Sequence, residues 1–206
     1  MISTADAHTG VGSTAGFAHG LGHPFSGLDH ILAMVAVGLF AARLGGRALC
    51  LVPASFVAMM AVGGILGISG IGLPLVELGI ATSVIVLGAL VALQTSMPTS
   101  LAMGLAGFFA LFHGHAHGAE MPVDSSGLGY ALGFMLATAL LHMGGIALGL
   151  GIARLASGSS QRFVQVGGGA MAVAGVVILT GYLETQSHSR VKSWPSFAMR
   201  FSGVSS

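Results

Sequence analysis

Six long apolar runs follow one another along the chain, separated by short polar stretches. They cover about residues 24–42, 48–68, 73–93, 97–113, 128–153 and 163–183. Within the runs, apolar residues do not alternate with polar ones, as the strands of a membrane barrel require. A helix needs about 20 mostly apolar residues to cross the hydrocarbon of a bilayer. The pattern therefore predicts an all-α, polytopic membrane protein with a bundle of six transmembrane helices.

The flanks of these runs divide the chain into three parts. Residues 1–22 are the expected N-terminal segment outside the membrane, and within it residues 8–22 are rich in Gly, Thr and His and are expected to be mobile. Residues 23–184 are the predicted six-helix transmembrane domain, and residues 185–206 show no helix pattern and are expected to be a disordered tail. The segment Ala5-Asp6-Ala7 resembles the last residues before a signal-peptidase cut. We interpret residues 1–7 as a signal-peptide remnant, with a chance terminus as the alternative.

Composition makes lipid the main solvent of the chain. Its 206 residues are 54% apolar and only 6% charged, whereas soluble domains are about 25% charged. The mean hydropathy is +0.91. The net charge is +1 without a basic cluster that could follow a phosphate backbone, so nucleic acid is not an expected partner. The 34 glycines indicate close helix packing through small residues spaced four apart.

Arginines predict the orientation in the membrane. Arg43 and Arg47 lie between the first two runs, and Arg154 and Arg162 lie between the last two. When six spans are threaded, both loops fall on one side, which the positive-inside rule makes cytoplasmic. The N-terminus is then outside. The three cations between residues 190 and 200 would also be outside, which conflicts with the rule.

Nine histidines and only six carboxylates form a biased set in so apolar a chain. Six of the histidines gather at the outer ends of the first and fourth runs: His19, His23, His30, His113, His115 and His117. An ionisable side chain in a bilayer costs at least about 2.5 kcal/mol, so each is by default a functional hypothesis. The simplest geometry is one vestibule that is lined from two helices.

Imidazoles and carboxylates together suit Ni²⁺, Co²⁺, Zn²⁺ or Cu²⁺, whereas the single Cys50 cannot form a thiolate cage. If the fourth helix continues for another turn, then His113, His117 and Glu120 share one face. Gly114 and Gly118 leave a loop of histidines as the alternative.

The spacing within the first run sets a limit on one shared ion. His23 and His30 are seven residues apart, so in a straight helix their Cα atoms lie about 10.5 Å apart. Two side chains can barely meet one ion at that distance. Either the helix is broken at Ser26-Gly27, which frees backbone carbonyls, or the motif supplies two successive sites. Asp29 lowers the electrostatic cost of a divalent cation at that depth.

Two more ionisable residues lie inside predicted spans. Glu77 lies about one turn into the third run, and an ionised carboxylate in apolar surroundings needs a cation or a proton. We therefore expect Glu77 on the ion path. His142 lies near the middle of the fifth run, where a role on the path and an interhelical hydrogen bond are both open.

The chain resembles the HupE/UreJ family of nickel/cobalt permeases, which are found with hydrogenase and urease genes in bacteria. The resemblance is carried by HPFSGLDHILAMVAVGLFAA, PLVELGIATSV and FHGHAHGAE, and it extends from His8 to about Leu183. It implies that His23, Asp29 and His30 are the family's signature for divalent nickel or cobalt. It also implies a bacterial inner-membrane protein with a periplasmic N-terminus.

The sequence therefore predicts a secondary permease that carries Ni²⁺ or Co²⁺ from the periplasm to the cytoplasm and supplies hydrogenase or urease maturation. We expect no prosthetic group and no enzymatic activity; the metal ion is the substrate. No GxxxxGK[ST] motif for ATP is present, so the membrane potential or a partner would drive transport. The oligomeric state stays open, a homo-oligomer included.

Two other functions remain as alternatives. In an intramembrane zinc-dependent hydrolase, His23, His30 and His142 would hold Zn²⁺, and Asp29 or Glu120 would be the base. A metal sensor or storage subunit without ion flux is the third possibility. Both would use the same kinds of ligand as a permease.

Overall fold

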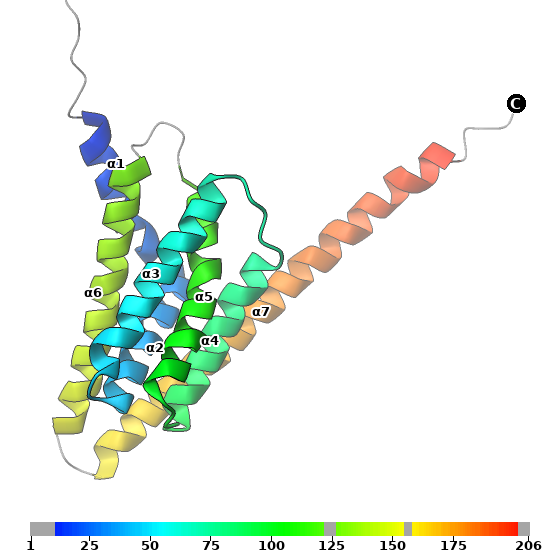
Figure 1. Cartoon of the computed structure of the whole chain (residues 1–206). Helices are drawn as coiled ribbons and strands as arrows, with labels where there is room; N and C mark the ends of the chain where they lie inside the picture. Colours follow the sequence, from blue (N-terminus) through cyan, green and yellow to red (C-terminus); the bar gives the residue numbers. More distant parts are fainter. Residues whose placement is uncertain (1–10, 122–126, 155–157, 202–206) are drawn as a thin grey trace, which may run out of the picture.

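The computed structural model describes residues 11–121, 127–154 and 158–201 (Figure 1). Within these ranges it is all-helical, with no strand, which confirms the all-α part of the predicted fold class. The elements are, in order, α1 (Val11–Gly22), the 3₁₀ turn η1 (His23–Phe25), α2 (Leu28–Leu44), α3 (Ala48–Ile68), α4 (Val76–Ala92), α5 (Thr99–Ala119), α6 (Gly127–Arg154) and α7 (Gly158–Phe201).

Several of these helices can cross a bilayer by length and composition. Three do so as single helices, over Ala48–Ile68, Gly127–Arg154 and Gln161–His188. The bent pair Gly16–Phe25 and Leu28–Leu44 would make a fourth span, and Val76–Ala92 is apolar but shorter. The described part of the chain is thus a membrane protein with three to four candidate spans.

The segment before the first apolar run contains a helix, α1, that the sequence did not predict. In α1, Gly20 lies against the backbone of Tyr130 on α6, and Gly133 on α6 lies against the backbone of Phe17. Small residues let two helix backbones approach closely, so a segment too polar to span can still pack on a span. The proposed signal-peptide remnant, residues 1–7, lies outside the described residues.

The last helix also differs from its prediction. We expected disorder from residue 185, whereas α7 continues as a helix to Phe201. No Gly or Pro occurs between Gly181 and Pro195, and each residue that extends a helix adds a hydrogen bond. In Figure 1 this part of α7 extends beyond the other helices. Residues 202–206 lie outside the described residues.

Glycines bring the helices into backbone contact, as their abundance predicts. Gly63 and Gly67 on α3 lie against the backbone of α5, and Gly114 and Gly118 on α5 lie against the backbone of α3. Glycines also line the contacts of α2 with α6 and of α4 with α7: Gly38, Gly145, Gly88 and Gly168. The α3–α5 contact is the most extensive in the bundle, and it fixes the C-terminal half of α5.

The bundle has two chemically different ends. The ends of α2 and α6 and the starts of α3 and α7 lie at one end, while α1, the α3–α4 connection and the end of α5 lie at the other (Figure 1). The first end contains Arg43, Arg47, Arg154 and Arg162. The arginines therefore lie together, opposite the histidine-rich end.

Candidate metal site

A sharp break between η1 and α2 shapes the entrance to the site. The Ser26 hydroxyl donates to the carbonyl oxygen of His23 at 2.7 Å, and the Ser26 amide donates to the same oxygen at 3.0 Å. Gly27 then takes an extended conformation before α2 begins. The helix axes on the two sides differ by 81°. The break falls at Ser26-Gly27, one of the two geometries that the His23–His30 spacing allowed.

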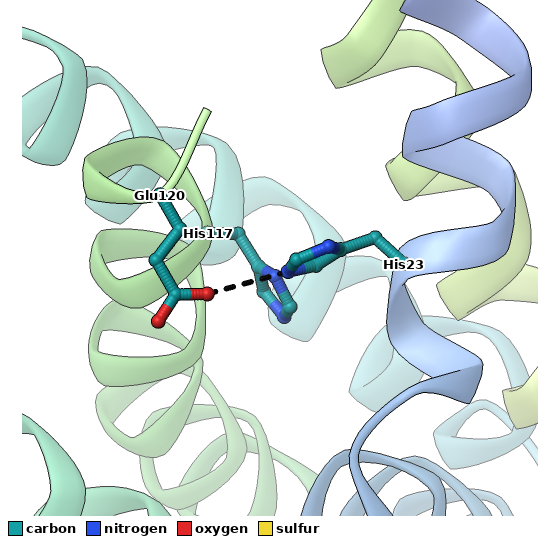
Figure 2. Close-up of side chains that lie close together, drawn as sticks. All are labelled: His23, His117 and Glu120. Atoms are coloured by element: carbon teal, nitrogen blue, oxygen red, sulfur yellow. Dashed lines mark ion pairs between the residues drawn. The ribbon is translucent and has the colours of Figure 1, made fainter. Parts of the chain in front are cut away.

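His23, His117 and Glu120 gather where η1 meets the end of α5, and we call them the outer cluster (Figure 2). One ligand atom from each lies within 4.8 Å of the others. His23 Nε2 lies 3.4 Å from Glu120 Oε2, and the rings of His23 and His117 pack edge to face with centroids 4.7 Å apart. Glu120 is exposed and His117 is buried. The cluster therefore leads from the surface into the bundle.

This arrangement depends on α5 continuing as a helix to Ala119. The helix passes through Gly114 and Gly118, both of which contact the backbone of α3. The glycines thus permit close packing and do not end the helix. His113 and His117 consequently lie one turn apart on the same face.

Two more imidazoles lie further inside the bundle, so that His23, His117, His30 and His113 form a row of rings, which we call the row. The ring of His117 packs on that of His30 with centroids 4.3 Å apart, and His30 packs on His113 at 4.8 Å. Asp29 Oδ1 accepts hydrogen bonds from Nδ1 and from the backbone amide of His30, each at 2.8 Å. His113 is fully buried. Ionisable residues from α2 and α5, far apart in the sequence, are thus brought together.

The third predicted carboxylate also lies near this row. Glu77 is an exposed residue in the first turn of α4. It is close enough to Asp29, Glu120 and His30 for their charges to act on it. Three carboxylates around a row of imidazoles create a negative field that attracts a divalent cation.

Two predicted residues lie off the row. His19 is exposed on α1. His115 Nε2 instead lies 2.8 Å from the carbonyl oxygen of Ile71 and 3.2 Å from the amide nitrogen of Leu73. His115 therefore contacts the α3–α4 connection.

The ring of Phe56 lies between His142 and the row. Phe56 packs on His113 with centroids 5.6 Å apart and on His142 at 5.1 Å. Within the described part of the chain, neither ring nitrogen of the buried His142 has a hydrogen-bond partner. The interhelical hydrogen bond that we considered for it is thus not formed there.

The ligand triad of the hydrolase alternative is not assembled. Among the described residues, the one group of three donors within 4.8 Å is His23, His117 and Glu120. Neither His30 nor His142 belongs to it. No zinc site with the proposed ligands is therefore present in that part of the chain.

Two neighbours of the histidines were not predicted as residues of the site. Ser83 on α4 lies 2.9 Å from His113 Nε2, measured from its hydroxyl oxygen. The ring of Phe134 on α6 lies against that of His117 with centroids 3.9 Å apart. A single Ser or Phe in an apolar helix carries no sequence signal, because its partner lies on another helix.

Comparisons with known proteins agree with the resemblance. The family model described as HupE / UreJ protein matches residues 1–178. The chain is 52% identical to Protein HupE of Rhizobium leguminosarum bv. viciae over 182 residues, which cover 88% of this chain and 93% of that protein. No solved structure shows significant similarity. The family match includes the outer cluster and both inner histidines.

Proposed function

Because this chain belongs to the HupE/UreJ family, we propose that it is a permease that carries Ni²⁺ or Co²⁺ from the periplasm to the cytoplasm. The observation that supports this most is the outer cluster. Its nitrogen and oxygen donors lie within 4.8 Å of one another and adjoin a row of buried imidazoles. Captured metal would supply the maturation of hydrogenase or urease.

The donor types suit capture followed by release. Imidazole and carboxylate ligands bind Ni²⁺ and Co²⁺ well, and they replace part of the hydration shell that the ion loses on entry. Glu120 and His23 meet the ion first because they are the more exposed members of the outer cluster. Without thiolates, the site holds the ion less tightly than a closed structural site does.

We place six spans, α2 to α7, in the bacterial inner membrane, with α1 on the periplasmic side. This topology puts the arginine-containing end in the cytoplasm, in line with the positive-inside rule. The histidine-rich end then faces the periplasm. Entry of a divalent ion would follow the membrane potential, which is worth about 2.3 kcal/mol per charge per 100 mV.

Loss of the outer cluster should reduce uptake in cells. We expect His23→Ala and Glu120→Gln each to lower ⁶³Ni²⁺ uptake by about tenfold or more, because each removes a ligand. Exposed His188 on α7 offers a matched control, and His188→Ala should retain uptake. Competition by Co²⁺, Zn²⁺ and Mn²⁺, with and without an uncoupler, would report selectivity and the energy source. Unchanged uptake in both cluster variants would refute the proposed entrance.

His115 offers a contrasting test within the same helix. His115→Ala should lower the melting temperature of the purified protein by a few degrees, because a hydrogen bond is worth about 1 kcal/mol. Nickel uptake per folded molecule should stay within about twofold of wild type. Thermal unfolding in detergent and uptake, normalised to protein in the membrane, measure the two effects. A tenfold loss of uptake in folded protein would put His115 on the path.

A further inference from the structure

Ser83 fixes the tautomer of His113. The Ser83 hydroxyl oxygen lies 2.6 Å from the carbonyl oxygen of Ile80, to which it donates its single hydrogen. The 2.9 Å contact between this hydroxyl and His113 Nε2 therefore requires the imidazole to donate. Nδ1 of a neutral His113 is then unprotonated and presents its lone pair. Among the described residues, this buried atom has no hydrogen-bond partner.

Asp29 does the same for His30. A carboxylate can only accept, so the 2.8 Å contact with Asp29 Oδ1 makes His30 Nδ1 the donor. Nε2 of the neutral ring then presents its lone pair, and this buried atom also lacks a partner within the described ranges. A carboxylate behind the far nitrogen is the arrangement that orients metal-binding histidines. An unpartnered buried acceptor destabilises the folded protein, and a metal ion would offset that cost.

The ring spacings are close to those of imidazoles that share one ion. The nitrogens of His30, His113 and His117 must still move closer together, because they do not lie within 4.8 Å of one another as the donors of the outer cluster do. With metal–nitrogen bonds of about 2.1 Å, two imidazoles at right-angled or tetrahedral positions have ring centres roughly 4.5 to 5.3 Å apart. His30 and His113 are 4.8 Å apart, and His30 and His117 are 4.3 Å apart. Small ring rotations suffice to close the difference for the second pair.

His117 contacts both the outer cluster and the pair formed by His30 and His113. Its ring packs on that of His23 in the outer cluster and on that of His30 in the pair. Neither of its nitrogens has a hydrogen-bond partner in the part of the chain that the structure describes. No hydrogen bond there needs to be broken for the ring to turn from one group to the other.

We propose that His30 Nε2, His113 Nδ1 and His117 form a second, inner station for a divalent cation, with Ser83 as the residue that positions His113. His117 is common to both stations, so they are occupied in turn. The ion keeps one ligand while it exchanges His23 and Glu120 for His30 and His113. This inference rests on the proposed permease function and adds the step after capture.

Equilibrium dialysis of the purified full chain with Co²⁺ tests the inner station without any flux. The double variant His23→Ala/Glu120→Gln lacks two ligands of the outer cluster, and we expect it still to bind one Co²⁺. Adding His113→Leu, which fills the buried volume, should weaken binding at least tenfold and remove one imidazole from the X-ray absorption signal of Co²⁺. Adding His115→Ala should change neither, because His115 faces the α3–α4 connection.

Ser83 gives a milder test on the same background. Ser83→Ala should weaken Co²⁺ binding about tenfold, and Ser83→Thr, which keeps the hydroxyl, should restore it. The inner station is refuted if the double variant binds no Co²⁺, or if His113→Leu leaves its affinity unchanged. If wild-type protein carries Ni²⁺ but shows no binding at the inner station, the inner station is refuted and the permease function is not. If the inner station binds Co²⁺ but the protein carries no Ni²⁺, only the permease function is refuted.

Discussion

Asp29→Asn will abolish most nickel uptake and leave the fold intact. The asparagine carbonyl oxygen can still accept the two hydrogen bonds that Asp29 Oδ1 accepts from His30. The substitution therefore removes the negative charge and little else. Changes behind a metal-binding histidine cost about 10- to 100-fold in affinity or activity, and the lost charge no longer offsets the dication. We expect an initial rate at subsaturating Ni²⁺ at least tenfold below wild type.

Uptake of ⁶³Ni²⁺, normalised to the protein in the membrane, measures this effect. Glu184 is an exposed carboxylate on α7, so Glu184→Gln is the control for removing a charge elsewhere. A melting temperature close to wild type would show that Asp29→Asn is folded. A wild-type rate in that variant would mean that the charge of Asp29 is not needed.

Gly114→Ala will destabilise the protein strongly, although it adds a single methyl group. A Cβ at Gly114 would overlap the carbonyl group of Met60, which belongs to the α3 backbone and cannot rotate away. The two helices must separate, and overpacking of this kind costs about 3 kcal/mol. For a chain of this size we expect a fall in melting temperature of roughly 10 °C. Uptake should also fall because the neighbouring His113 moves with the backbone.

Gly104 is the matched control on the same helix. Its Cβ position is open space, and alanine is the better helix former by about 1 kcal/mol. Gly104→Ala should therefore be neutral or stabilising in thermal unfolding. Equal melting temperatures for the two variants would show that the α3–α5 backbone contact does not set stability.

The sequence predicted those helices whose surfaces face lipid or neighbouring helices, because such helices are apolar along their length. The run 48–68 has the same bounds as α3, and 128–153 differs from α6 by one residue at each end. The break at Ser26-Gly27 was also within reach, because the separation of His23 and His30 left few other solutions. Because polar groups are costly in an apolar chain, nearly every residue of the row could also be predicted as a functional candidate.

Other features depend on partners that a sequence does not name. α1 was missed because its small residues carry no apolar periodicity, and its partner is α6. The role of Ser83 depends on His113, which is 30 residues away. His115 could have been separated from His113 and His117, since it lies about 200° from His113 around a helix. Gly114 and Gly118 left that helix in doubt.

Sealed liposomes that contain a nickel-sensitive dye and the purified protein test the central claim most directly. Wild type should admit Ni²⁺ at a saturable rate well above that of protein-free liposomes. His115→Ala should do the same, whereas His117→Ala should reduce entry to the protein-free rate, because both stations lose their shared ligand. Absence of entry through the wild type, or equal entry through His117→Ala, would contradict the account.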